Sequence, residues 1–190
     1  PAATARFINP PDCAVIRATR YQRKDTTMTS SSARTTPDAH PIDALIVGAG
    51  FSGMYMLHKL RGLGFNATVL EAGSGVGGTW YWNRYPGARV DIQSLEYSFG
   101  FDEDLEAEWR WSERYAPQAE LERYANHVAD RFDLRRDIRF NTRVTAAHWD
   151  EKAQLWSVET DKGAHYRARH LILATGCLSI PTDVTFPGLE

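Results

Sequence analysis

Hydrophobic residues recur along the chain with the period of strands in some segments and of helices in others. Residues 44–47 form a short apolar run that ends in glycines, which predicts a buried parallel strand. Apolar residues follow at helical spacing over residues 51–63, and Gly64 is typical of a helix end. Residues 67–71 predict a second strand. This order of strand, glycine turn, helix and strand is that of a βαβ crossover and indicates an α/β fold.

The pattern is different after this unit. Residues 72–100 are rich in glycine and aromatic residues without a period, which predicts a long functional loop. One face of residues 117–132 is apolar, which predicts an amphipathic helix. Short strands are expected at 138–140, 144–149, 156–160 and 166–168, two of them with the alternation of an antiparallel ribbon. Residues 171–176, Leu-Ile-Leu-Ala-Thr-Gly, predict another buried strand that ends in a glycine.

The N-terminal segment has no such pattern. It is rich in Ser, Thr, Pro, Ala and Arg, so residues 1–40 are expected to be a disordered extension. Met28 opens the polar run before the first strand and is expected to be the true start. Residues 1–27 would then be upstream translation or part of the extension. An organellar transit peptide is the alternative, although the acidic residues of this segment disfavour it.

The composition bounds the class of protein. Of 190 residues, 43% are hydrophobic and 24% are charged, which excludes a wholly disordered chain. The net charge of -2 gives no electrostatic reason to expect a nucleic-acid or anionic membrane partner. No apolar stretch is long enough to span a bilayer. Cys13 and Cys177 fit neither a disulfide framework nor a metal site, so a cytoplasmic protein without a metal is expected.

Residues 48–53, Gly-Ala-Gly-Phe-Ser-Gly, fit the GxGxxG pattern of dinucleotide-binding proteins. Gly48 permits the tight turn, Gly50 lets the backbone approach a pyrophosphate, and Gly53 lets the helix pack closely. The helix N-terminus offers unpaired N–H groups to the phosphates. Glu71 ends the next strand, where a carboxylate accepts from ribose hydroxyls and repels a 2′-phosphate, so FAD or NAD is expected rather than NADP. The alternative is a glycine turn and a solvated glutamate in another α/β fold.

Two features favour a flavin over a nicotinamide. After Glu71 the chain stays in a glycine-rich loop, where the backbone can approach a bulky cofactor. Small residues at 174–176 would leave room beside it. Either feature alone could reflect packing. Together they resemble the FAD domain of the glutathione-reductase-like class, which contains two dinucleotide-binding folds.

The loop at residues 77–91, Gly-Gly-Thr-Trp-Tyr-Trp-Asn-Arg-Tyr-Pro-Gly-Ala-Arg-Val-Asp, resembles that of Baeyer–Villiger flavoprotein monooxygenases of the cyclohexanone and phenylacetone type. Three later segments agree with it, residues 111–115, 128–134 and 174–179. The resemblance implies a Rossmann-like FAD-binding domain with a small antiparallel ribbon over residues 41–190. The second glycine motif, for NADPH, does not occur in these residues, so the domain is expected to be incomplete, truncated before the NADPH domain.

The resemblance implies an NADPH- and O₂-dependent monooxygenase that converts a ketone into an ester or lactone through a C4a-peroxyflavin. The alternatives are an N- or S-oxidising flavin monooxygenase and a truncated remnant without catalysis. The chain by itself is expected to bind FAD weakly and not to complete a turnover.

The resemblance also implies roles for single residues. The FAD-binding residues would be Gly48, Gly50, Phe51, Ser52, Gly53, Glu71, Gly78, Thr79, Trp80, Asp91, Tyr97, Val144 and Gly176. Val144 would offer its backbone to the adenine. Asp91, the candidate catalytic residue, would lie near the flavin and position an arginine from another part of the enzyme. The alternatives are a carboxylate that caps backbone amides for Asp91, and a buried aromatic cluster for Trp80.

Overall fold

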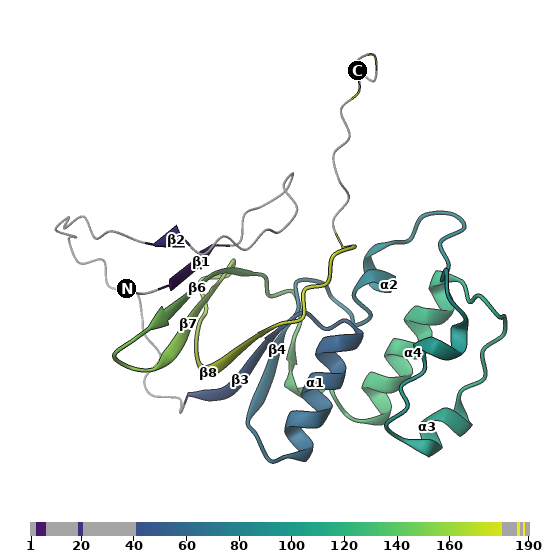
Figure 1. Cartoon of the computed structure of the whole chain (residues 1–190), viewed down its shortest axis with the longest axis horizontal. Helices are drawn as coiled ribbons and strands as arrows, with labels where there is room; N and C mark the ends of the chain where they lie inside the picture. The colour runs from purple at the N-terminus through teal and green to yellow at the C-terminus, as the bar shows by residue number, and fades with distance from the viewer. Residues whose placement is uncertain (1–2, 7–18, 21–40, 180–185, 187, 189–190) are drawn as a thin grey trace.

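Figure 1 shows the computed structural model of the chain, which describes residues 3–6, 19–20, 41–179, 186 and 188. Two short strands, β1 (Ala3–Arg6) and β2 (Thr19–Arg20), fall in the N-terminal extension. β1 pairs antiparallel with β2 and with β6 (Val144–Asp150). The rest of residues 1–40, including Met28, lies outside the described residues, so the expected disorder stays a prediction.

One eight-stranded sheet runs through the described part of the chain, in the order β2-β1-β6-β7-β8-β3-β4-β5. Its parallel half consists of β3 (Ile42–Val47), β4 (Ala67–Leu70), β5 (Ile138–Arg139) and the end of β8 (His165–Leu173). Its antiparallel half contains β6, β7 (Leu155–Thr160) and the start of β8. The predicted α/β class with an antiparallel ribbon is confirmed.

β8 joins the two halves of the sheet, where the sequence predicts two separate strands. Ala168 pairs with Trp156 of the ribbon and also with Ile42 of the parallel half. The polar residues that interrupt the apolar pattern, Arg169 and His170, are exposed and do not interrupt the backbone pairing. The expectation of a buried strand over residues 171–176 is wrong at its end, because β8 ends at Leu173 and Leu173 is 38% exposed.

Both faces of β3 and β4 are covered, which explains their continuous apolar sequences. Helices α1 (Phe51–Gly62) and α4 (Gln118–Arg131) lie side by side over one face (Figure 1). Ile46 and Val69 pack there against Met54 and Ala129. On the other face, alternate strand residues pack against the ribbon, and these are Leu45 and Leu70 with Val144, Ala147 and Val158. The predicted helices at 51–63 and 117–132 are confirmed to within one residue at each end.

The predicted loop at residues 72–100 is not without structure. It contains α2 (Thr79–Trp82) and the 3₁₀ turn η1 (Ser94–Tyr97), and a second 3₁₀ turn, η2 (Arg135–Asp137), follows α4. Helix α3 (Glu103–Glu108) was not predicted. Its sequence signal is the N-cap Asp102, whose carboxylate accepts from the Leu105 amide at 2.8 Å and precedes an acidic first turn.

Candidate dinucleotide site

The carboxyl ends of three parallel strands meet at one edge of the sheet. Gly48 follows β3, Glu71 follows β4 and Ala174 follows β8, and the pairing of β3 with both neighbours brings these three positions together. Open α/β sheets bind their ligands at this edge. The candidate site is therefore built on strand ends that the core holds rigidly.

The turn after β3 requires two of its glycines. Gly48 has a φ of +104°, and a Cβ added to it would lie 2.6 Å from the carbonyl oxygen of Ala174. A Cβ on Gly53 would lie 1.9 Å from the carbonyl oxygen of Gly48. The first glycine thus allows the turn and the last allows α1 to pack on it, as the pattern predicts.

The middle glycine faces a second glycine loop. A Cβ on Gly78 would lie 2.9 Å from the Cα of Gly50, and one on Gly50 would lie 3.5 Å from the Cα of Gly78. The Gly77 amide also donates to the Ala49 carbonyl at 3.0 Å. The two loops therefore touch backbone to backbone, and this contact requires that Gly78 has no side chain, whereas a Cβ on Gly50 would lie at ordinary contact distance.

The N-terminus of α1 offers free donors to a ligand. Gly50 is the N-cap and has no side chain to cap the helix, and the first turn contains no acidic residue. Within the described residues, the amides of Phe51, Ser52 and Gly53 have no hydrogen-bond partner. Together with the helix dipole, these donors fit an anionic group such as a pyrophosphate.

Glu71 links the turn after β3 to the loop after β4. It is 4% exposed, its Oε2 accepts from the Ala49 amide at 2.6 Å, and its Oε1 accepts from the Gly73 amide at 2.7 Å. The alternative of a solvated glutamate is wrong. Each carboxylate oxygen retains a second lone pair, so the side chain can still accept from a ribose hydroxyl.

The glycines directly after Glu71 make room for a tyrosine. A Cβ on Gly73 would lie 2.6 Å from Cε1 of Tyr81, and one on Gly75 would lie 3.1 Å from the same ring. The Ser74 amide donates to the Tyr81 hydroxyl at 3.0 Å, and the two hydroxyls lie 2.8 Å apart. These hydrogen bonds lower the pKa of Tyr81. Gly73 and Gly75 therefore allow the Tyr81 ring to pack on the loop, and the approach of a cofactor to this loop stays a prediction.

Trp80 lies in a buried aromatic and aliphatic cluster. It is 8% exposed, packs with Val90 and Leu121, and meets the Tyr97 ring edge-on at 5.7 Å. Its carbonyl accepts from the side-chain amide of Gln118. Thr79, the first residue of α2, is half-buried. This packing holds α2 in place. The Trp80 side chain therefore lies in a buried aromatic cluster, which is the alternative that the sequence left open.

Asp91 is exposed, and within the described residues no hydrogen bond or ion pair involves its side chain. The described residues therefore do not support the alternative in which the Asp91 carboxylate caps backbone amides. Burial first and then the negative charge of Asp91 raise the pKa of Tyr97, so the carboxylate acts electrostatically on this ring. A carboxylate without a partner near the aromatic cluster can receive a cation.

The remaining sequence candidates lie around these loops. The Phe51 ring turns into the aromatic cluster, 5.8 Å from Tyr97, whereas Ser52 is exposed. Val144 is 5% exposed and packs in the same cluster as Leu70, next to Glu71 in the chain. Gly176 has a φ of +67° with nothing within 4 Å of an added Cβ, so conformation and not crowding favours glycine there.

The sequence model of a family described as pyridine nucleotide-disulphide oxidoreductase matches residues 45–190, well over half of the chain. The chain belongs to this family. The Rossmann-like fold inferred from the glycine turn is thereby confirmed.

Individual proteins that are similar in sequence to this chain are monooxygenases. Acetone monooxygenase (methyl acetate-forming) of Gordonia sp. (strain TY-5) is 48% identical over 147 residues, which cover 77% of this chain and 28% of that enzyme. Phenazine N-monooxygenase of Lysobacter antibioticus is 43% identical over 154 residues, which cover 80% of this chain and 28% of that enzyme.

A solved structure agrees with these relatives. Cyclohexanone monooxygenase from Rhodococcus sp. Phi1 bound to NADP⁺ is 46% identical with a TM-score of 0.75, covering 79% of this chain and 29% of that chain. The resemblance to Baeyer–Villiger monooxygenases is confirmed. The chain spans less than a third of the length of each of these proteins.

Two arginines of the loop at residues 77–91, here called the aromatic loop, form ion pairs at the surface. Arg84 pairs with Glu122 at 2.5 Å, and Arg89 pairs with Glu113 at 2.9 Å. Both arginine side chains are about half exposed. In this family member they form surface ion pairs, which contribute little to stability.

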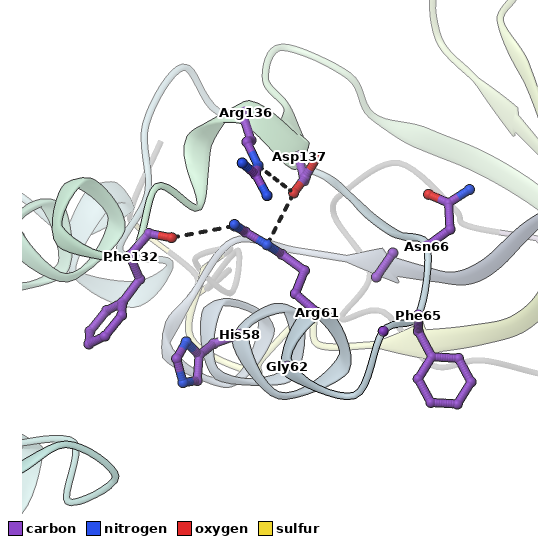
Figure 2. Close-up of a pocket in the computed structure, with 10 residues that line it drawn as sticks. His58, Arg61, Gly62, Phe65, Asn66, Phe132, Arg136 and Asp137 are labelled. Carbon is purple, nitrogen blue, oxygen red and sulfur yellow. Dashed lines mark hydrogen bonds and ion pairs between the residues drawn. The ribbon is translucent and has the colours of Figure 1, made fainter.

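A hollow of about 530 Å³ lies at the other end of α1, away from the glycine turn. Figure 2 shows that Arg61 reaches across it toward Phe132 and Asp137, and that Arg136 also contacts Asp137. The cations that line it are thus paired within the protein. None of the sequence-predicted site residues lines this hollow.

Two further observations concern metal binding and membrane-spanning helices. Among the described residues, no group of three or more His, Cys, Asp and Glu side chains is arranged to hold a metal ion. No described helix is long and apolar enough to cross a membrane.

Proposed function

We propose that residues 41–190 form the FAD-binding domain of a flavin monooxygenase. One observation carries this proposal: the free amides at the N-terminus of α1 lie where two glycine loops meet backbone to backbone, above the buried Glu71. A cradle built largely of glycine backbone, with free donors and a carboxylate, fits the pyrophosphate and ribose of a dinucleotide.

Within this proposal, the residues divide along the cofactor. Gly48, Gly50 and Gly53, with the amides of Phe51 and Ser52, would hold the pyrophosphate. Glu71 would hold the adenosine ribose, and Val144 would offer its backbone to the adenine. The flavin end would lie beside Gly78, Thr79, Trp80, Asp91, Tyr97 and Gly176. Bound FAD supplies the redox and oxygen chemistry, and the protein binds it, orients it and excludes water.

For the longer protein, we propose an NADPH- and O₂-dependent conversion of a ketone into an ester or lactone. The similarity to an acetone monooxygenase that forms methyl acetate supports a small-molecule ketone as substrate. Asp91 would act at the flavin by orienting a cation supplied from outside this chain. We propose that the protein acts in the cytoplasm, where the exposed Cys177 thiol stays reduced.

A second candidate reaction is oxidation at nitrogen. The 43% identity to phenazine N-monooxygenase supports it, because it is nearly as high as the 48% identity to acetone monooxygenase. The two reactions separate in one assay of a full-length enzyme that contains this chain. Incubation with NADPH, O₂ and either a cyclic ketone or an aromatic N-heterocycle should give a lactone from the first and no N-oxide from the second. An N-oxide alone would favour the second candidate.

FAD binding by the chain itself tests the first proposal directly. The purified 190-residue chain should take up the yellow flavin absorbance in equilibrium dialysis against FAD and should melt at a higher temperature when FAD is in excess, and both measurements detect weak binding. A chain that stays colourless and gains no thermal stability from excess FAD would contradict the proposal.

A further inference from the structure

Glu120 is a carboxylate whose burial no part of the sequence pattern explains. It lies in the first turn of α4 and is 3% exposed. Its Oε1 accepts from the Ser112 amide at 2.9 Å and its Oε2 accepts from the Ser112 hydroxyl at 2.7 Å. No ion pair involves Glu120 in the described part of the chain. A buried charge without a cation is unfavourable, so its two hydrogen bonds to one residue point to a positional role.

Ser94 is a second buried polar residue on the facing segment. It is 2% exposed, and its amide donates to the Arg114 carbonyl at 2.8 Å. Its hydroxyl donates to the Glu113 carbonyl at 2.8 Å and accepts from the Ala116 amide at 2.8 Å. Ser94 therefore binds three backbone groups of the segment that begins at Ser112.

Backbone hydrogen bonds join the same two segments at further positions. The Val90 amide donates to the Ala116 carbonyl at 3.1 Å, and the Gln118 amide donates to the Ala88 carbonyl at 2.8 Å. Residues 88–94 thus lie along residues 112–118, and Glu120 fixes the latter segment to α4. Asp91 lies between the two anchored positions Val90 and Ser94, while its own side chain is exposed.

We propose that Glu120 and Ser94 are positioning residues that set where the Asp91 carboxylate stands. This inference rests on the proposed function, in which Asp91 lies beside the flavin. Because both ends of the Asp91 segment are hydrogen-bonded to backbone that Glu120 holds, loss of either side chain releases the carboxylate without touching the glycine cradle. Loss of either side chain should therefore change the position of the Asp91 carboxylate without changing the affinity for FAD.

Four variants of the chain, each loaded with FAD, test this inference. D91N removes the carboxylate itself. S94A removes one hydroxyl from the contacts between the two segments. E120Q keeps the shape of the side chain and removes its charge; its oxygen can accept from the Ser112 amide, but the Ser112 hydroxyl must turn to accept from its NH₂ group, so E120Q should disturb these contacts less than S94A does. E113Q is the matched control, because it removes an exposed negative charge from the same segment, keeps a side-chain oxygen that can accept from Arg89, and leaves the Glu113 carbonyl that binds Ser94.

The visible spectrum of bound flavin and its Kd are measured for each variant, with amide hydrogen exchange as an independent readout. D91N should shift the flavin spectrum, and S94A and E120Q should shift it in the same direction while the Kd for FAD stays within about threefold of wild type. The Val90 and Ala116 amides should exchange faster in S94A and E120Q, whereas the Leu45 and Ile46 amides of β3 should not. E113Q should match wild type throughout.

The outcomes separate this inference from the proposed function. If wild type binds no FAD, both are wrong. If FAD binds and D91N shifts the spectrum but neither S94A nor E120Q does, the inference alone is overturned. It is also overturned if D91N leaves the spectrum unchanged, or if E113Q has the same effect as S94A. FAD binding would stand in these last three cases.

Discussion

At the scale of single residues, Glu71 illustrates how one carboxylate organises two loops. Its two oxygens accept from the Ala49 and Gly73 amides, which belong to the turn after β3 and to the loop after β4. Burial excludes water as a substitute partner. The residue that the sequence assigns to a ribose therefore also links two loops of the protein itself.

Replacement of Glu71 by glutamine should destabilise the chain even without a ligand. The E71Q side chain directs an NH₂ group at one of the two amides, which leaves a buried donor unpaired at a cost of about 1–3 kcal/mol. Urea unfolding followed by circular dichroism measures this loss. The exposed Glu103 provides the control, since E103Q should change stability by no more than about 0.5 kcal/mol. Equal stability of E71Q and wild type would contradict the role assigned to the two hydrogen bonds.

The contact between Gly50 and Gly78 makes a second prediction at this scale. The branched side chain of G50V would meet the Gly78 backbone, which already lies 3.5 Å from an added Cβ, and would fill the space above the free amides. FAD binding should weaken at least about tenfold, measured by quenching of flavin fluorescence. G62V is the matched control on the same helix, because nothing lies within 4 Å of a Cβ at Gly62. Wild-type affinity in G50V would place the pyrophosphate elsewhere.

At the scale of elements, helix α3 depends on charge as well as on capping. The amide of Leu105, and then the guanidinium of Arg131, lower the pKa of the Asp102 carboxyl below its ordinary value of 3.8. A carboxyl with a lowered pKa in the folded state stabilises the fold above its unfolded pKa, and this contribution is lost as the pH falls through the folded pKa.

The D102N variant should therefore melt below wild type near neutral pH. The difference in Tm between the two proteins should shrink as the pH falls below 3.8, because wild-type Asp102 then becomes protonated as well. Thermal melts followed by circular dichroism at several pH values measure this. A Tm difference that does not change with pH would mean that the charge of Asp102 is not involved.

At the scale of the whole molecule, the site is assembled from segments that FAD would join. The glycine turn follows β3, Glu71 follows β4, and the aromatic loop is held by α4 through Gln118. Since a ligand that contacts all of these segments binds only the folded chain, it should stabilise the fold as a whole.

FAD at about 100 times its Kd should stabilise the chain by about 2.7 kcal/mol, which a thermal melt detects as a higher Tm. FMN is the control, because it lacks the adenosine ribose that Glu71 is proposed to hold. It should stabilise the chain much less at the same concentration. Equal stabilisation by the two flavins would contradict the proposed role of Glu71.

The sequence by itself determined the βαβ unit, its glycine turn and helix α4. These features depend on contacts between residues close in the chain, such as the apolar face of a helix or the conformation that Gly48 requires. The family resemblance followed from the same local signals, since the loop from Gly77 to Asp91 is contiguous.

Only the tertiary structure decided which distant segments meet. β8 is one strand because Ala168 pairs with two partners far away in the chain, and Gly73 is small because Tyr81 packs on it. Likewise, nothing in the pattern distinguishes buried Ser94 or Glu120 from surface residues. Their burial depends on how α4 and the aromatic loop pack together, and no local period encodes such packing.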